Sequence, residues 1–405
     1  MTKITDIPAI RFKGFSDTWE QRKVGDLLIE RNQQAPMSDE YPLMAFIANE
    51  GVAPKGDRYD RSALVTDTAN KLYKKTEIGD FIYSSNNLET GSIGLNKYGK
   101  ACISPVYSIF EPTGIADSDF LGRRLVRKDF INAMVKWRQG VIYGQWRIHE
   151  SDFLKIEIPV PSVVEQRKIG AYLDQLDRLI TLHQRKYDKL TNVKKSMLGK
   201  MFPQNGSNVP EIRFKGFTEA WEQRKLSEIA TMHARIGWQN LRTSEFLDNG
   251  DYMLITGTDF MDGAVNFDTC HYVERERYEQ DKHIQIRNGS ILITKDGTLG
   301  KVAYIQGLTM PATLNAGVFN VEIRDEKEVD NRYLFQYLKA PFLMDYVDKK
   351  ATGGTIKHLN QNILVDFPVV LPQKDEQAKI GEYFLGIDNL ITLHQRELEK
   401  LKNLK

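Results

Sequence analysis

The residues best suited to chemistry lie in polar loops that contain glycine and occur in two separate parts of the chain. SSNNLETGSIGLNKYGK begins at Ser84 in the first part, and TKDGTLGK and KKATGGTIKHLNQ begin at Thr294 and Lys349 in the second. Lysine suits contact with phosphate, while amide and hydroxyl groups suit hydrogen bonding to base edges. We therefore predict that these loops, and a segment near Tyr143, contact DNA. The candidate residues are Ser92, Asn96, Lys97, Lys100, Tyr143, Gln145, Arg147, Lys295, Thr298, Lys301, Lys357, His358 and Asn360.

The alternative is that these loops only face solvent, as the polar loops of mixed α and β domains commonly do. GTLGK at Gly297 is not a nucleotide-binding loop, because a Walker A loop needs GxxxxGK followed by Ser or Thr. When the two parts of the chain are aligned by sequence, Leu95 falls opposite Lys301. This alignment argues against a phosphate-binding lysine common to both parts.

The sequence carries none of the motifs that indicate a catalytic centre. It lacks a GxGxxG fingerprint, an HExxH pair, a nucleophile elbow and the NPPY or DPPY tetrapeptide of amino-methyltransferases. Cys102 and Cys270 are far apart and have no CxxC neighbour, so we expect reduced, buried thiols rather than a disulfide or a zinc site. We therefore expect no catalytic residue and no metal ligand in this chain.

Composition excludes several classes of protein. With 41% hydrophobic and 27% charged residues the chain is too apolar for disorder, and its 405 residues suffice for two or three domains. No apolar run is long enough for a signal peptide or a membrane span, so we predict a cytoplasmic protein. The formal net charge is only +2, so a basic surface for DNA would have to be local.

The elements that must position the polar loops occur twice. IRFKGFSDTWEQRKVGDL at Ile10 returns as IRFKGFTEAWEQRKLSEI at Ile212. EQRKIGAYLDQLDRLITLHQRKYDKLTNVK at Glu165 returns as EQAKIGEYFLGIDNLITLHQRELEKLKNLK at Glu376. The repeat of about 200 residues is too long for a solenoid, whose period is about 20 to 50 residues. Between the matched segments the copies diverge, which indicates one scaffold with two different surfaces.

The second pair of matched segments predicts two long helices. Their seam residues recur with spacings of 4 and 3, which is a heptad pattern. We expect the helices to pack antiparallel within one chain, because neither narrow stripe can be buried alone and each finds the other at high effective concentration. Pairing with a second chain or with a partner's helices is the alternative. The predicted seam residues are Ile169, Leu173, Leu176, Ile180, His183, Tyr187, Leu190, Ile380, Phe384, Ile387, Ile391, His394, Leu398 and Leu401.

Two details of these helices can be predicted. His183 and His394 occupy equivalent seam positions, and we expect core histidines, with a ligand or a pH switch as the alternative. The first helix should end at Met201 and Phe202, before Pro203, and the second should be about two turns shorter.

The diverged segments predict an α+β fold. Residues of about 28–150 and 230–360 mix short β-branched or aromatic runs with turn residues and one or two helices, which indicates mixed sheets. We predict globular domains at 1–155 and 211–365, a central helix and linker at 156–210, and a distal helix at 366–405, related by pseudo-two-fold symmetry. The helix over residues 169–197 would span about 42 Å, close to 12 base pairs, and would hold two DNA-reading domains about one turn of DNA apart.

The order of these motifs resembles that of the specificity subunits of type I restriction-modification systems, over nearly the full length of the chain. The likeness rests on the doubled RFKGF…WEQRKL segment and on the GDFIY and GSILITKDGTLGK elements at Gly79 and Gly289. It also rests on PVPSVVEQRKI at Pro159 and PQKDEQAKI at Pro372, although PVVLPQKDEQ replaces the tighter turn in the second copy. The resemblance implies a non-catalytic subunit in which two target-recognition domains each read one half of a bipartite, gapped DNA target.

The resemblance also implies partners. It implies two methyltransferase subunits that methylate adenine N6 with S-adenosylmethionine and dock largely around the helices. It further implies two restriction subunits that translocate DNA with ATP and Mg²⁺, while this chain itself binds no cofactor. The alternatives from other classes are an enzyme with an unrecognised centre, such as a nuclease, and a coiled-coil adaptor that binds proteins only. Inert behaviour of the purified chain with DNA, Mg²⁺ and S-adenosylmethionine would exclude the first, and salt-sensitive retention on DNA in the presence of methyltransferase would exclude the second.

Overall fold

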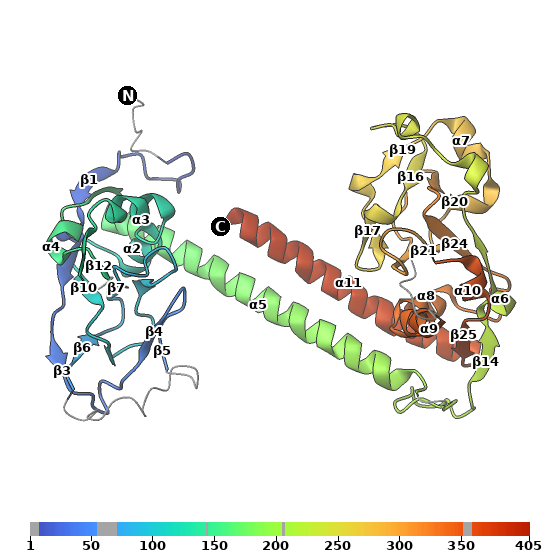
Figure 1. The fold of residues 1–405 in the computed structure, drawn as a ribbon, viewed down its shortest axis with the longest axis horizontal. Helices are drawn as coiled ribbons and strands as arrows, with labels where there is room; N and C mark the ends of the chain where they lie inside the picture. Colours follow the sequence, from blue (N-terminus) through green and yellow to red (C-terminus); the bar gives the residue numbers. More distant parts are fainter. Residues whose placement is uncertain (1–7, 55–70, 143–144, 205–206, 351–358) are drawn as a thin grey trace. The chain divides into compact units, whose positions relative to one another are not determined.

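The chain forms two compact units. The computed structural model describes residues 8–54, 71–142, 145–204, 207–350 and 359–405 (Figure 1). Unit 1 comprises Met1–Thr181 and Asn403–Lys405, and unit 2 comprises Leu182–Lys402. Helix α5 (Val163–Met201) is one continuous element that begins in unit 1 and ends in unit 2.

Unit 1 is built from short strands and five helices in its described residues. Its strands are β1 (Glu20–Lys23), β2 (Leu28–Glu30), β3 (Gln34–Ala35), β4 (Ala45–Ile47), β5 (Gly51–Ala53), β6 (Tyr73–Thr76), β7 (Phe81–Tyr83), β8 (Ile93–Leu95), β9 (Ala101–Ile103), β10 (Ser108–Pro112), β11 (Gln139–Ile142), β12 (Gln145–Arg147) and β13 (Glu157–Val160). Its helices are α1 (Val24–Leu27), α2 (Ser118–Arg124), α3 (Lys128–Val135), α4 (Glu150–Phe153) and the first part of α5.

Unit 2 repeats this plan with additional short elements. Its strands are β14 (Glu222–Lys225), β15 (Ala230–His233), β16 (Met253–Ile255), β17 (Phe260–Met261), β18 (Ala264–Val265), β19 (His271–Tyr272), β20 (Gln285–Ile286), β21 (Ile291–Thr294), β22 (Val302–Tyr304), β23 (Ala312–Leu314), β24 (Val318–Ile323) and β25 (Pro368–Leu371). Its α-helices are α6 (Leu226–Ile229), α7 (Arg275–Glu279), α8 (Asn331–Lys339), α9 (Phe342–Lys350), α10 (Gln361–Val365) and most of α11 (Lys374–Leu404). Its 3-10 turns are η3 (Gly237–Gln239), η4 (Thr243–Glu245), η5 (Gly257–Asp259), η6 (Phe267–Thr269) and η7 (Lys282–Ile284).

The same four-stranded sheet forms the centre of both units. Its strand order is β2-β10-β7-β8 in unit 1 and β15-β24-β21-β22 in unit 2, and all pairs are antiparallel. The inner strands β7 and β21 read FIY and ILIT and are buried along their whole length. Continuous apolar runs of this kind indicate strands that are covered on both faces. The duplicated sequence therefore folds as a duplicated sheet.

Around this sheet the two units differ. Unit 1 adds the three-stranded antiparallel sheet β3-β6-β9 and the hairpins β4-β5 and β11-β12. Unit 2 adds a four-stranded sheet, β19-β16-β23-β20, in which β16 and β23 run parallel, and the pair β17-β18. The predicted α+β class and mixed sheets are confirmed.

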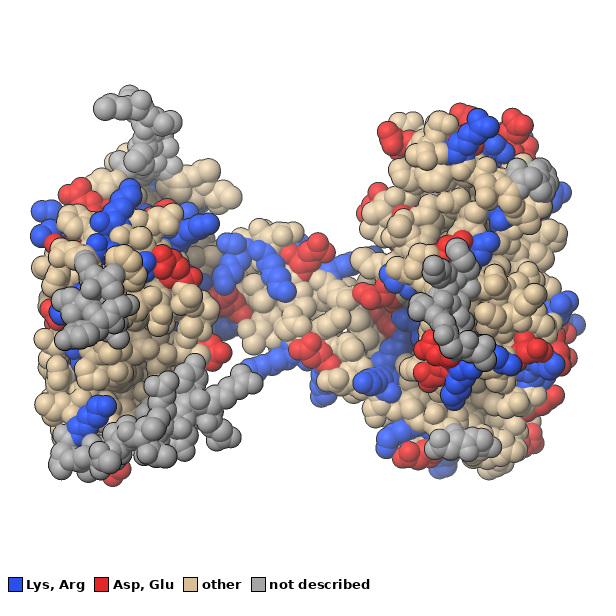
Figure 2. All heavy atoms as spheres, viewed as in Figure 1, with Lys and Arg blue, Asp and Glu red and all other residues tan. Residues whose placement is uncertain are grey.

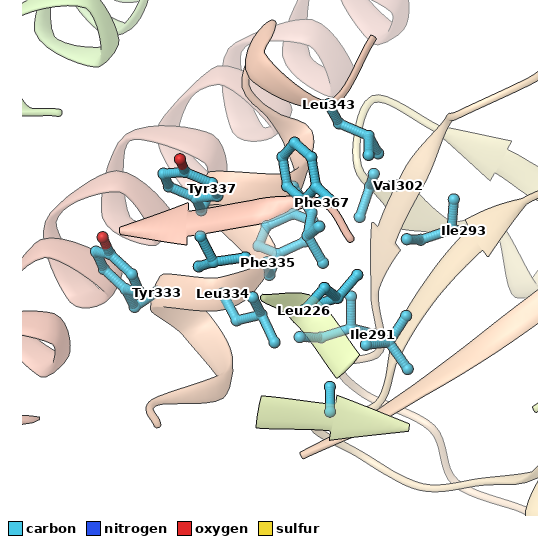
Figure 3. Close-up of a cluster of buried hydrophobic side chains, with 14 of the residues drawn as sticks. Leu226, Ile291, Ile293, Val302, Tyr333, Leu334, Phe335, Tyr337, Leu343 and Phe367 are labelled. Atoms are coloured by element: carbon cyan, nitrogen blue, oxygen red, sulfur yellow. The ribbon is translucent and has the colours of Figure 1, made fainter. Parts of the chain in front are cut away.

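The core of unit 2 lies between its central sheet and helices α8 and α9. Figure 3 shows side chains of α8 meeting Ile291 and Ile293 of β21 and Val302 of β22, with Phe367 beside them. Phe202, at the end of α5, is 1% exposed and contacts the rings of Trp221 and Phe384. The predicted end of the first helix is confirmed, because α5 stops at Met201 where Phe202 enters this core.

The two long helices lie side by side in unit 2 (Figure 1). His183 meets His394, Tyr187 meets Gln395, and Lys194 meets Asp388, so partners run in opposite directions along the two helices. The predicted antiparallel pairing within one chain is confirmed.

All fourteen predicted seam residues are buried or half-buried. The buried ones are Leu176, Ile380, Phe384, Ile387, Leu398 and Leu401, and the half-buried ones are Ile169, Leu173, Ile180, His183, Tyr187, Leu190, Ile391 and His394. None of the helices in the described residues combines the length and hydropathy needed to cross a bilayer.

Candidate nucleic-acid interface

Each unit is fixed to its long helix by a buried ion pair that we call the helix clasp. In unit 1, Arg11 donates from Nε and Nη2 to the two carboxylate oxygens of Glu165, at 2.7 Å each. The side chain of Glu165 is 1% exposed. Hydrogen bonding to this carboxylate raises the pKa of Arg11. Two parallel bonds between a guanidinium and a carboxylate fix direction as well as distance.

Aromatic contacts extend the clasp of unit 1 along the helix. Phe12 packs edge-on against Tyr172, with ring centroids 5.6 Å apart. The ammonium group of Lys168 lies 5.0 Å from the centre of the Phe15 ring, a cation-π contact. The RFKGF segment therefore lies against the first turns of α5.

The same contacts recur at the start of α11 in unit 2. Arg213 donates to both carboxylate oxygens of Glu376 at 2.7 Å, and the Glu376 side chain is fully buried. Phe214 packs edge-on against Tyr383 at 6.1 Å, and Lys379 lies 4.9 Å from the centre of the Phe217 ring. The duplicated opening segment is thus one structural device used twice.

The glutamine that follows each clasp glutamate binds a second segment of the domain to the long helix. Gln166 accepts a hydrogen bond from the Asp117 N–H at 2.9 Å, and Gln377 accepts one from the Asp330 N–H at 2.9 Å. Both aspartates cap the helix that follows them. A Cβ added at Gly381 would lie 2.7 Å from the backbone nitrogen of Tyr333, so only glycine allows α8 to approach α11 this closely.

The strand after the RFKGF segment, β1 or β14, leads into the central sheet of its unit. β1 pairs antiparallel with β13, which directly precedes α5, and β14 pairs in the same way with β25, which directly precedes α11. The clasp therefore holds the start of each domain and the start of its helix together. Sequence reasoning identified these segments but missed the ion pairs, although the joint duplication of Arg11 with Glu165 was a usable signal.

Polar groups are buried between the paired helices. Lys194 is 8% exposed, and its ammonium group lies 2.6 Å from Asp388 Oδ1. Gln336 donates to the other carboxylate oxygen of Asp388 at 2.8 Å, and Lys339 lies 3.4 Å from Oδ1. Burial, together with the charge of Lys339, lowers the pKa of Lys194 to about 8.

His183 and His394 face each other in the same seam. Their Nδ1 atoms are 3.1 Å apart, so one ring must donate and the other must accept. Burial and the neighbouring His183 lower the pKa of His394. The contact satisfies one nitrogen of each half-buried ring.

In unit 1 the candidate loop residues have different surroundings. Ser92 and Asn96 are buried. The Asn96 amide donates to Thr76 and Gly99 and accepts from the backbone of Tyr98, so it stabilises a turn and has no free edge for a base. Because both side chains are buried, DNA cannot reach them, and we assign them a structural role.

The charged candidates of unit 1 are exposed. Lys97 pairs with Asp174 of α5 at 3.0 Å, and Lys100 pairs with Glu40 and lies over the Tyr41 ring. Arg147 is the most open of them, with Glu150 at 3.8 Å. Contact with phosphate would have to replace these exposed ion pairs, which are worth little in water.

In unit 2 the loop between β21 and β22 is a closed turn. The Thr294 N–H donates to the Lys301 carbonyl at 2.9 Å, and the Lys301 N–H donates to Thr294 Oγ1 at 3.0 Å. Gly297 and Gly300 have φ of 72° and 69°, a conformation that favours glycine. Thr298, within this turn, and Lys301, at its base, are both exposed.

The structure brings two of the candidate segments of unit 2 together. Lys295 is half-buried and its ammonium group lies 5.4 Å from the centre of the Phe319 ring. The Leu359 N–H donates to the Lys295 carbonyl at 2.8 Å, so the exposed Asn360 lies beside the β21–β22 turn. Tyr143, Lys357 and His358 lie outside the described residues, as does the side chain of Gln145.

One detail of the sequence alignment was wrong. Strand register places Ile93 opposite Tyr83 and Val302 opposite Ile293, so Ser92, and not Leu95, corresponds to Lys301. The loops differ in length, which shifted the alignment made from sequence. Because Ser92 carries no charge, a phosphate-binding lysine at this position is still not common to both units.

No single-sign surface dominates either unit on the face that Figure 2 shows. Acidic and basic side chains are interspersed over both units there.

Cys102 and Cys270 are both buried free thiols, and burial raises the pKa of Cys270 to about 12.

Comparison with known proteins assigns this architecture to a family. The family model for the type I restriction modification DNA specificity domain matches residues 16–192 and 218–403. The type I restriction enzyme MjaVIII specificity subunit of Methanocaldococcus jannaschii is 23% identical over 406 residues, covering 96% of this chain and 90% of that protein. The putative MjaX specificity subunit of the same organism is 23% identical over 265 residues, covering 65% of this chain and 59% of that protein.

A solved structure has the same fold. The crystal structure of the type I restriction-modification S subunit from M. genitalium matches with a TM-score of 0.61 at 14% identity, covering 99% of this chain and 96% of that chain. Two DNA specificity domains on long helices define the class. Because the family model covers most of its length, this chain belongs to the specificity subunits of type I restriction-modification systems. The resemblance stated from sequence is confirmed.

The buried lysine of the helix pair predicts a pH dependence of stability. The pKa of Lys194 is about 8 in the folded chain, below the 10.5 of an exposed lysine. The unfolded state therefore binds more protons between these values, and stability should rise as pH increases from about 8 to 10.5. The rise should be at most about 3 kcal/mol, and Lys194→Met should remove it. Urea unfolding of the full chain at several pH values measures this effect.

Lys195→Met is the matched control, because Lys195 is exposed on the same helix turn. The assignment is contradicted if the profiles of wild type and Lys194→Met run parallel, or if Lys195→Met flattens the profile equally.

Proposed function

We propose that this chain is the DNA-reading subunit of a type I restriction-modification complex, and that each unit reads one half of a bipartite, gapped double-stranded target. The observation that carries the proposal is the doubled helix clasp with its doubled central sheet, joined through the single helix α5. Two copies of one scaffold with different loops suit two different half-sites. The relatives named above are specificity subunits, which supports the same reading.

The reading residues are expected on the exposed loops. Lys97, Lys100 and Arg147 in unit 1, and Thr298 and Lys301 in unit 2, are open enough to meet phosphate or base edges. Their present partners are carboxylates that are at least partly exposed, or solvent, so DNA can replace them at small cost.

Chemistry is supplied by partners in this proposal. Two methyltransferase subunits that use S-adenosylmethionine methylate adenine N6, and two restriction subunits use ATP and Mg²⁺. This chain contributes no catalytic residue, binds none of these cofactors itself, and the complex acts in the cytoplasm. The absence of nucleotide-binding and methyltransferase motifs from the sequence supports this division of labour.

The long helices set the gap between the half-sites. α5 has 39 residues, and at 1.5 Å per residue it extends for about 58 Å. The buried Lys194–Asp388 pair and the facing histidines fix the register of the helix pair, because a shift along the seam would leave these groups without partners.

Methylome sequencing tests the proposal most simply. A host that expresses this chain with its methyltransferase should carry N6-methyladenine in one interrupted motif that is absent from the host without this gene. Exchanging residues 218–365 for those of a relative should change one half of the motif and leave the other half intact. Identical methylomes with and without the gene would contradict the proposed function.

Lengthening the helix tests the spacer role separately. Insertion of four residues between Thr181 and Leu182 adds slightly more than one helical turn, about 6 Å, and should lengthen the gap by one or two base pairs. Both half-site sequences should stay unchanged. As a control, four residues inserted after Pro203, where α5 has ended, should leave the gap as it is. An unchanged gap after the helix insertion would overturn the spacer role.

A further inference from the structure

One face of the central sheet of unit 2 gathers side chains that bind metals. In the antiparallel pair of β15 and β24, Thr231 lies opposite Glu322 and His233 lies opposite Asn320. Residues two apart on a strand share a face, so these four polar side chains lie together. Met232 and Val321, which alternate with them, are buried in the core of unit 2.

A second histidine is held against this face by the turn η7. Asn320 Nδ2 donates to the carbonyl of His283 at 2.9 Å, and the His283 N–H donates to Asp281 at 2.9 Å. The His283 backbone is thus fixed on both sides. Its ring stacks on that of His233, with centroids 4.5 Å apart and planes 20° from parallel.

We propose that His233, His283 and Glu322 form a binding site for a divalent transition-metal ion such as Zn²⁺. One nitrogen of each imidazole and one carboxylate oxygen of Glu322 all lie within 4.8 Å of one another. Two imidazoles and a carboxylate are an established donor set for zinc, which leaves a fourth position for water. This inference does not depend on the proposed function.

Both rings must adjust to bind an ion. Thr231 Oγ1 lies 3.0 Å from His233 Nε2, the nitrogen nearest to Glu322, and must give up this contact when that nitrogen binds the ion. Since imidazole lone pairs lie in the ring plane, the exposed His283 ring must turn out of the stack to bind. Its fixed backbone limits this movement to the side chain.

Unit 1 shows how the same position is closed without metal. Glu111 lies opposite Ile29 in the pair of β2 and β10, as Glu322 lies opposite Thr231. The residue in the place of His233 is Arg31, which pairs with Glu111 at 2.6 Å and with Asp80 at 2.9 Å. In unit 2 the guanidinium is replaced by imidazole, and the nearest approach of His233 to Glu322 is 3.9 Å.

A metal bound here would tie η7 to the central sheet. The stretch from β15 to η7 includes β16 and β19, two strands of the second sheet of unit 2, so the bond would restrain part of the region in which this unit differs from unit 1. We therefore expect the ion to stabilise the fold of unit 2, while unit 1 needs no ion at the equivalent position.

Calorimetric titration of the chelator-stripped full chain with Zn²⁺ tests the site. Wild type should bind one ion that is weakened at least tenfold in His233→Ala, His283→Ala and Glu322→Gln. His233→Arg should restore the arrangement of unit 1, and it should fold and yet fail to bind. Thermal unfolding gives a second readout, since Zn²⁺ should raise the Tm of wild type and leave the Tm of these variants unchanged.

Two histidines elsewhere provide controls. His271→Ala removes an exposed histidine of unit 2, and His394→Ala removes one ring of the helix-seam pair. Both should keep the tight site. The proposal is overturned if His233→Ala and His283→Ala bind as wild type does, if His394→Ala abolishes binding, or if wild type shows no saturable binding.

Discussion

A buried carboxylate at the base of each long helix constrains the rest of this molecule. Glu165 and Glu376 are almost fully shielded from water, and an unpaired charge in such a place would cost several kcal/mol. Arg11 and Arg213 must therefore be present, and each lies on a segment that leads through β1 or β14 into the central sheet of its unit. Because the partner of the carboxylate lies more than 150 residues away in sequence, the pair forms only when the whole domain has folded onto its helix. The domain therefore folds and takes up its orientation on the helix in a single step.

The two copies share the clasp and differ where a specificity subunit needs difference. The central sheet keeps its strand order in both, while the added sheets and the polar loops do not match. The seam between the helices contains polar groups at two places, where the histidines face each other and where Lys194 meets Asp388. Two helices with a purely apolar seam could shift by one heptad relative to each other. Here such a shift would leave buried polar groups without partners, so only the observed register avoids that free-energy cost. The helix pair can then serve as a spacer of defined length.

Much of the fold follows from the sequence, because the repeat is close enough to be seen and the heptad rhythm is regular over many turns. The end of α5, the antiparallel pairing and the strands FIY and ILIT were all predictable from pattern alone. The recognition loops were not, since their residue types do not reveal burial. Asn96 has a side chain suited to hydrogen bonding with a base, but in the structure it stabilises a turn. The difference in loop length led to the wrong alignment of Lys301. The clasp and the histidine cluster join residues distant in sequence, and only the paired strands bring them together.

The account depends most on the claim that the buried ion pair holds each domain on its helix. A double-mutant cycle on Arg213 and Glu376 in the full chain, read by denaturant unfolding, measures this directly. Residues that contact each other in this way should show a coupling energy of about 1 to 3 kcal/mol, and either single substitution should cost nearly as much as the double one. A coupling energy near zero, with additive single effects, would show that the domains are held by other contacts and would contradict the account.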